Sequence, residues 1–111
     1  MEVKQISDEI SVSPQIKPDD LKAIQEAGFK SIICNRPDDE EAGQINFPEI
    51  ENAARAIGLD ARYIPFLPGK MTEDDVSQFA IAMRELPGPV FAYCKSGGRS
   101  AAIWNASQTL G

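Results

Sequence analysis

Histidine is absent from the 111-residue sequence. This absence excludes a Ser-His-Asp triad or a Cys-His pair within the chain. It also excludes histidine-ligated zinc or iron, and two cysteines are too few for a thiolate metal site. We therefore predict no metal and no cofactor. Any cysteine nucleophile in this chain has to be activated by groups other than imidazole.

Long apolar runs are also absent. No stretch approaches the roughly 18 residues that a membrane span needs, and the N-terminal residues lack the basic-then-apolar pattern of a secretion signal. The sequence therefore predicts a cytoplasmic protein without a membrane partner. In that reducing compartment the two cysteines are expected to be free thiols, whereas a disulfide would require a secreted domain.

Basic residues are scarce in one half of the chain. The net charge is −6, and residues 1–60 carry 6 Lys and Arg against 13 Asp and Glu. Residues 61–111 carry 5 basic residues against 4 acidic ones. So acidic a chain argues against nucleic-acid binding. The less negative half suits a small anionic substrate better.

Short apolar runs alternate with helical patterns along the chain. Strands are predicted at residues 10–12 (with residues 3–6 beside them), 30–35, 61–65 and 89–93, and helices at 18–27, 47–57, 73–86 and 100–110. This alternation is typical of a single α/β domain over residues 1–111, with one mostly parallel sheet flanked by helices. Ligands of such sheets bind at the carboxyl ends of the strands. Cys94, Asn35-Arg36 and the segment 65–70 follow three of those ends.

The segment Cys94-Lys95-Ser96-Gly97-Gly98-Arg99 joins the last strand to the last helix. Its glycines allow a tight turn that presents backbone N–H groups, and the positive end of the helix points to the same place. We predict that Cys94, Arg99 and Ser100 are catalytic. In this prediction Arg99 binds an oxyanion through two parallel N–H groups of its guanidinium, and the Ser100 hydroxyl donates a hydrogen bond to the Cys94 sulfur.

The same features favour the thiolate form of Cys94 over the thiol. The backbone of residues 95–98, namely Lys95, Ser96, Gly97 and Gly98, is expected to bind the substrate. The alternative is a glycine-rich turn around a buried, inert cysteine.

This loop resembles the cysteine loops of protein tyrosine phosphatases and of rhodanese-type sulfurtransferases. The chain from Ile10 to Gly111 resembles the phosphatase-like domain family of the bacterial beta-lactamase-hydrolase-like proteins. The resemblance includes Ser13-Pro14-Gln15, the segment 27–33, Asn35-Arg36 and Tyr63-Ile64-Pro65, besides the cysteine loop. It implies a cysteine-phosphatase-like fold.

The loop itself favours sulfur chemistry. Four residues separate Cys94 from Arg99, one fewer than in the phosphatases and as many as in the rhodaneses. The stretch 65–70 lacks the aspartic acid that phosphatases use to protonate the leaving oxygen. We therefore predict transfer of sulfane sulfur through a Cys94 persulfide. The alternatives are hydrolysis of phosphate monoesters through a Cys94 thiophosphate, with Asp74 or Asp75 as the acid, and a catalytically silent anion-binding module.

Three further side chains each have two alternative roles. Arg36 is either a second oxyanion ligand or a surface arginine paired with the acidic segment 38–41, which we expect to be a solvated loop. Cys34 is expected to pack in the core, although a resolving role opposite Cys94 is an alternative. Lys70 either guides an anionic substrate or is a solvated turn residue.

The predicted partners follow from the chemistry. A sulfurtransferase needs a thiol acceptor such as glutathione, together with a small anionic sulfur donor, and a phosphatase needs a phosphate ester. Only 17 residues follow Cys94, fewer than rhodanese domains normally carry. One prediction is therefore that the domain is a fragment truncated at its C-terminus. Another is that it is fused to, or acts with, a metallo-hydrolase-like or sulfide-oxidising enzyme.

Overall fold

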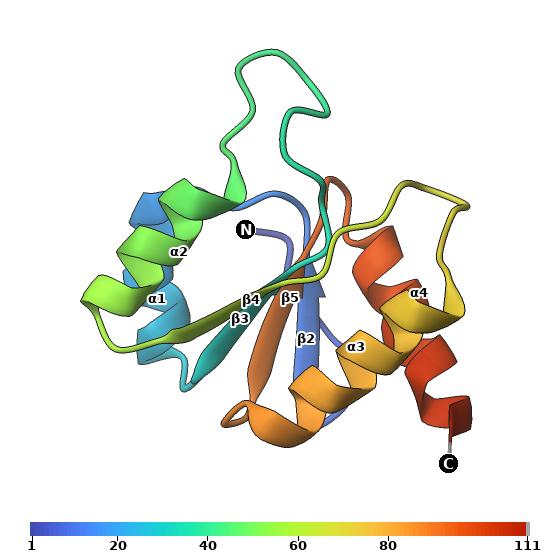
Figure 1. The fold of residues 1–111 in the computed structure, drawn as a ribbon. Helices are drawn as coiled ribbons and strands as arrows, with labels where there is room; N and C mark the ends of the chain where they lie inside the picture. The colour runs from blue at the N-terminus through green and yellow to red at the C-terminus, as the bar shows by residue number, and fades with distance from the viewer. Residues whose placement is uncertain (111) are drawn as a thin grey trace.

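Five strands form one sheet in the order β1-β2-β5-β3-β4 in the computed structural model, which describes residues 1–110 (Figure 1). The strands are β1 (Lys4–Gln5), β2 (Ile10–Ser13), β3 (Ser31–Cys34), β4 (Asp60–Tyr63) and β5 (Val90–Tyr93). The helices are α1 (Leu21–Glu26), α2 (Phe47–Ala56), α3 (Glu73–Glu85) and α4 (Gly98–Ser107), with 3₁₀ turns at Pro18–Asp20 and Gln108–Leu110. Gly111, the last residue of the predicted domain, lies outside the described residues.

The sheet is parallel except at one edge. β5 pairs in parallel with both β2 and β3, and β3 pairs in parallel with β4, whereas β1 pairs with β2 in the antiparallel sense. β2, β3 and β5 are buried at every position, as strands covered on both faces have to be. The predicted mostly parallel sheet, including the pairing of the first two strands, is confirmed.

Helices cover both faces of the sheet, with α1 and α2 on one side and α3 and α4 on the other (Figure 1). Because side chains alternate along a strand, β5 contributes to two cores. Phe91 and Tyr93 pack with Ile50 on the side of α2, and Val90 and Ala92 pack with Phe79 on the side of α3. This doubly covered sheet is the architecture that the alternating pattern predicts.

Local signals determine where the helices begin. Thr72 caps α3, since its hydroxyl accepts a hydrogen bond from the Asp75 N–H at 3.1 Å and the Asp75 carboxylate accepts one from the Thr72 N–H at 2.9 Å. This reciprocal pair satisfies two N–H groups that a helix terminus otherwise leaves unpaired. The predicted helix at 18–27 is a 3₁₀ turn followed by α1.

Two long loops rise beside the turn between β5 and α4 (Figure 1). One joins β3 to α2 and the other joins β4 to α3. The carboxyl ends of β3, β4 and β5 thus meet at one rim, as expected for the predicted strands. Over residues 1–110, no helix is both long and apolar enough to cross a bilayer.

Candidate active site

Cys94 lies at the start of a tight loop that leads into α4. Its side chain is fully buried, and its sulfur accepts a hydrogen bond from the Gly97 N–H at 3.0 Å. The Cys94 N–H is in turn held by the Ser13 carbonyl at 3.3 Å. The loop therefore fixes the sulfur at the N-terminus of α4, where backbone N–H groups favour a negative charge.

Glycine is required at one position of this loop. Gly97 has φ of +94°, a left-handed conformation that side-chain-bearing residues rarely adopt. A Cβ atom there would also lie 3.4 Å from the Ser13 backbone. This conformation turns the Gly97 N–H toward the sulfur. Gly98, the first residue of α4, and Ser96 are exposed.

Arg99 extends from the first turn of α4 to the acidic segment. Its Nη1 donates to Glu40 Oε2 at 2.7 Å and to the Phe66 carbonyl at 3.1 Å, and its Nη2 donates to Glu40 Oε1 at 3.0 Å. A guanidinium has five N–H donors. These contacts engage three of them and leave the Nε–H and one Nη2–H, which together form a fork suited to an oxyanion.

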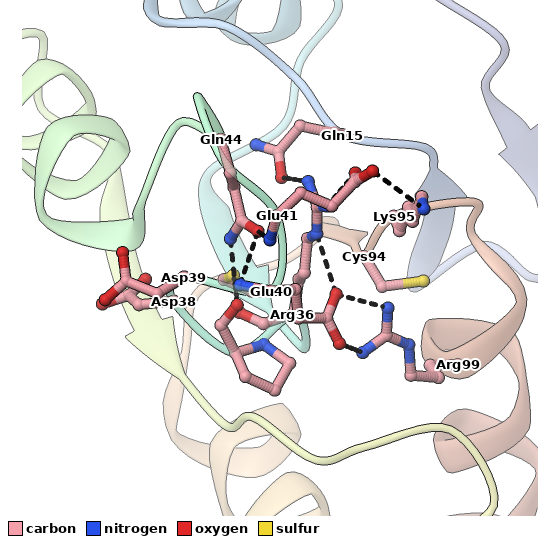
Figure 2. A network of polar contacts seen from close by, with 12 residues as sticks. Gln15, Arg36, Asp38, Asp39, Glu40, Glu41, Gln44, Cys94, Lys95 and Arg99 are labelled. Atoms are coloured by element: carbon pink, nitrogen blue, oxygen red, sulfur yellow. Dashed lines mark hydrogen bonds and ion pairs between the residues drawn. The ribbon is translucent and has the colours of Figure 1, made fainter.

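The charges around Arg99 stabilise each other. The hydrogen bonds that Arg99 donates to Glu40 are the largest cause that raises the pKa of Arg99, and the neighbouring Cys94 sulfur raises it further. The same Arg99 hydrogen bonds, reinforced by Arg36, hold the pKa of Glu40 below its usual range. Figure 2 shows the sulfur of Cys94 on the side of the network where Arg99 and Lys95 lie.

Arg36 is buried and tied to the acidic segment, with only 4% of its surface exposed. It donates to Glu40 at 2.9 Å, to Glu41 at 2.7 Å and to Gln15 at 3.0 Å (Figure 2). The predicted pairing with Glu40 and Glu41 is thus present, but Arg36 is not a surface residue. These contacts engage three of its five N–H donors, one on each nitrogen, and none of them shows an oxyanion site; a role as second oxyanion ligand stays a prediction.

The prediction of a solvated loop at 38–41 is correct only in part: Asp39 and Glu41 are exposed, but Glu40 is a largely buried part of the site. Glu40 bridges Arg36 and Arg99 and is only 14% exposed. Glu41 is half exposed and pairs with Lys95 at 3.3 Å. The segment thereby connects the end of β3 to both ends of the cysteine loop.

Ser100 takes part in a different contact from the predicted one. Its buried hydroxyl donates to Asn35 Oδ1 at 2.8 Å, at the end of β3, and not to Cys94. The Asn35 amide then donates to the Ile64 carbonyl at 2.9 Å. Ser100 and Asn35 therefore link α4 to the ends of β3 and β4, a contact that positions the loop.

Asp74 and Asp75 lie in the first turn of α3, as the sequence predicts. Asp74 is exposed and Asp75 is occupied by the Thr72 cap. Lys70 is exposed in the loop before them. Neither acid forms part of the network around Cys94 and Arg99.

Cys34 is a core residue, as predicted. It packs with Tyr93 on the α2 side of the sheet, and its thiol donates to the Arg36 carbonyl at 3.3 Å. Burial raises the pKa of the Cys34 thiol to about 11. Both cysteines are free thiols in the structure.

Alkylation rates should report the environment of Cys34. In a Cys94→Ser variant, which leaves Cys34 as its remaining thiol, we expect native protein to react at least about a hundredfold more slowly than urea-unfolded protein at neutral pH. The thiolate fraction is much smaller in the folded state, because the pKa of the thiol is raised there. The measurement is iodoacetamide labelling followed by intact-mass spectrometry. Equal alkylation rates for native and unfolded protein would contradict the buried position of Cys34.

Sequence reasoning missed two contacts of the network, that of Glu40 with Arg99 and that of Gln15 with Arg36. The partners in each contact are widely separated in sequence, by 59 positions for Glu40 and Arg99 and by 21 positions for Gln15 and Arg36. One signal was available. A run of acids directly follows a strand end at the rim where an arginine-bearing loop is expected.

Comparison with known proteins identifies relatives over nearly the whole chain. The family described as "Beta-lactamase hydrolase-like protein, phosphatase-like domain" matches residues 2–111. The Beta-lactamase hydrolase-like protein of Agrobacterium fabrum (strain C58 / ATCC 33970) is 36% identical over 110 residues, which are 99% of this chain and 26% of that protein. The chain thus spans about a quarter of the length of this curated relative.

Solved structures share the fold. A protein from Neisseria meningitidis Z2491 with a provisional phosphatase assignment superposes with a TM-score of 0.86 at 31% identity, covering 94% of this chain and 74% of that one. The core catalytic domain of the PP-IP phosphatase SIW14 from S. cerevisiae gives a TM-score of 0.74 at 15% identity, covering 97% and 65%. At that lower identity the likeness shows the fold alone, and the fold is that of the cysteine phosphatases.

Proposed function

Because this chain belongs to the family of phosphatase-like domains of beta-lactamase hydrolase-like proteins, we propose that it hydrolyses phosphate monoesters through Cys94. The observation that carries the proposal is the hydrogen bond from the Gly97 N–H to the Cys94 sulfur, in a loop that also presents the free fork of Arg99. Those donors are suited to a thiolate and to the oxygens of an attacked phosphoryl group.

The reaction proceeds in two displacements. The Cys94 thiolate forms a bond to phosphorus while the bond from phosphorus to the leaving oxygen breaks, and the departing oxygen takes a proton from water. Water then attacks the thiophosphate, which releases inorganic phosphate and restores the thiolate. Arg99 and the N–H groups of residues 95–99 stabilise the negative oxygens in both steps.

Sulfur transfer is the second candidate, and one feature of the loop favours it. Four residues separate Cys94 from Arg99, which gives a ring of N–H groups suited to a single sulfur. In this reaction the Cys94 thiolate takes the outer sulfur of a donor such as thiosulfate and releases sulfite. A thiol acceptor such as glutathione then removes that sulfur as a persulfide. No proton donor is needed for the departing sulfite.

Intact-mass spectrometry of rapidly quenched protein separates the two chemistries. After incubation with an aryl phosphate, we expect a gain of one phosphoryl group on wild-type protein and none on Cys94→Ser. If thiosulfate adds one sulfur atom to the protein, and neither a phosphoryl adduct nor phosphate release is seen, then sulfur transfer and not hydrolysis is the activity of the domain. Protein that is folded but forms neither adduct would be a binding module.

The relatives also bear on the wider context of the domain. The matched region is about a quarter of the Agrobacterium protein, and that protein's name refers to a hydrolase-like function. This supports a proposal that the phosphatase-like domain works beside a hydrolase-like domain, in the same chain or as a partner. Co-purification with such a hydrolase, and a change in its turnover, would test the proposal.

A further inference from the structure

The segment Ser13-Pro14-Gln15 lies against the start of the cysteine loop. The Ser13 carbonyl accepts a hydrogen bond from the Cys94 N–H at 3.3 Å, and the Gln15 N–H donates one to the Lys95 carbonyl at 3.3 Å. Pro14 between them has no N–H to donate. The backbone pairing of β2 with β5 therefore continues beyond the end of β5 and holds two consecutive residues of the loop.

The bond to the Lys95 carbonyl also orients the next N–H group of the loop. A trans peptide is planar, so its C=O and its N–H point in opposite directions. Because the Lys95 carbonyl is turned toward Gln15, the Ser96 N–H points away from Gln15. In Figure 2, Gln15 lies above Lys95, whereas the Cys94 sulfur and Arg99 lie below it. The contact with Gln15 therefore turns the Ser96 N–H toward the side on which an oxyanion would bind.

The Gln15 side chain is itself fixed by two hydrogen bonds. Its Oε1 accepts from Arg36 Nη1 at 3.0 Å, and its Nε2 donates to the Ile16 carbonyl at 2.9 Å. The two amide atoms cannot exchange places, because a guanidinium only donates and a carbonyl only accepts. Since Arg36 is buried, Gln15 is anchored to a group that solvent does not reach.

Arg36 connects this segment to the other end of the cysteine loop. Its Nε donates to Glu40 Oε1 at 2.9 Å, and the Glu40 carboxylate accepts from Arg99 at 2.7 and 3.0 Å. These contacts form a ring that the loop backbone closes, and its members are Lys95, Gln15, Arg36, Glu40 and Arg99. The side chains of Arg36, Glu40 and Arg99 are largely buried. The ring therefore fixes the position of Lys95 relative to Arg99.

We propose that Gln15 is a positioning residue, which holds the first peptide of the cysteine loop and, through Arg36, the free fork of Arg99 at the separation that a phosphoryl group needs. This inference rests on the proposed phosphatase function and assigns a further residue to that site. A tetrahedral oxyanion accepts from the Ser96 N–H and from Arg99 at the same time. Donors that are already aligned in the free protein lose less conformational freedom when the anion binds.

Equilibrium binding of tungstate to the Cys94→Ser protein tests the positioning without turnover. Tungstate is a tetrahedral oxyanion with two negative charges, like the phosphoryl group of a monoester. Gln15→Met keeps the length of the side chain but removes both of its hydrogen bonds. In isothermal titration calorimetry we expect Gln15→Met to weaken tungstate binding about threefold to tenfold. Unchanged affinity in Gln15→Met, or no tungstate binding to the Cys94→Ser protein itself, would overturn the proposal.

A double-mutant cycle separates positioning from a general loss of structure. Alignment has value only while the Arg99 fork is present, so in an Arg99→Lys background Gln15→Met should change tungstate affinity by less than about twofold. Thr72→Ala removes the cap of α3, which destabilises the domain away from the site, and should leave tungstate affinity unchanged. An equal effect of Gln15→Met in both backgrounds, or an equal loss in Thr72→Ala, would refute the positioning role. If the affinities change as expected but wild-type protein releases no phosphate from an aryl phosphate, the positioning role stands and the proposed hydrolysis fails.

Discussion

Arg99→Lys is expected to lower kcat/KM for aryl phosphate hydrolysis by about a hundredfold to a thousandfold. The guanidinium engages Glu40 and the Phe66 carbonyl with three N–H groups and keeps a fork for the substrate. A lysine ammonium has the same charge but three donors from one point. It cannot hold Glu40 and bind two phosphate oxygens at the same time.

Phosphate release from p-nitrophenyl phosphate measures this effect. Arg84→Lys on the last turn of α3 is the matched control, because Arg84 is exposed and lies outside the site. The control should keep its activity within about twofold, as exposed substitutions away from special features usually do. A loss smaller than about threefold in Arg99→Lys would mean that Arg99 provides only charge.

Glu40→Ala is expected to destabilise the folded domain by about 2 kcal/mol near neutral pH. The substitution removes the carboxylate that Arg36 and Arg99 share, and Arg36 is only 4% exposed. Leaving a buried guanidinium without part of its counter-charge is costly. Arg36 keeps Glu41 and Gln15, so the domain should still fold.

The effect of Glu40 should also depend on pH in a defined direction. The pKa of Glu40 is lower in the folded protein than in the unfolded chain. Its stabilisation is therefore complete above the unfolded pKa of about 4.3 and disappears as the pH falls through the lower folded value. Wild type and Glu40→Ala should accordingly converge in stability in acid.

Urea unfolding followed by circular dichroism, at about pH 7 and at about pH 3, tests both statements. Glu26→Ala serves as the control, because Glu26 is exposed on α1. Its stability should differ little from that of wild type at either pH. A difference between wild type and Glu40→Ala that grew in acid would contradict the ion-pair account.

The elements that the sequence predicts correctly are those specified by neighbouring residues. Val90–Tyr93 is a short unbroken apolar run between turn residues, a pattern typical of a buried strand. Thr72 with Asp75 three residues later specifies the start of α3. The cysteine loop is likewise local, since its glycines and the following helix are contiguous. The place of the loop at the carboxyl edge of the sheet follows from its position directly after a strand of a parallel sheet.

The parts that could not be predicted depend on partners distant in sequence. Ser100 is near Cys94 in the chain, but its hydroxyl donates to Asn35, 65 residues away. In the sequence nothing distinguishes Glu40 from the neighbouring acidic residues. Its contact with Arg99, 59 positions away, forms only when the chain folds. Two acceptors are near the Ser100 hydroxyl, whereas two arginines share the Glu40 carboxylate, and in both cases geometry, not residue type, decides the contacts.

The position of β5 has a consequence for how the domain folds. β5 lies between β2 and β3, which have no direct pairing with each other. The β1-β2 hairpin and the β3-β4 pair therefore remain separate halves until residues 90–93 insert between them. Such late, long-range pairing makes folding slow and leaves strand edges open beforehand. During synthesis on the ribosome, the strand that leads directly into Cys94 is thus the one that completes the sheet.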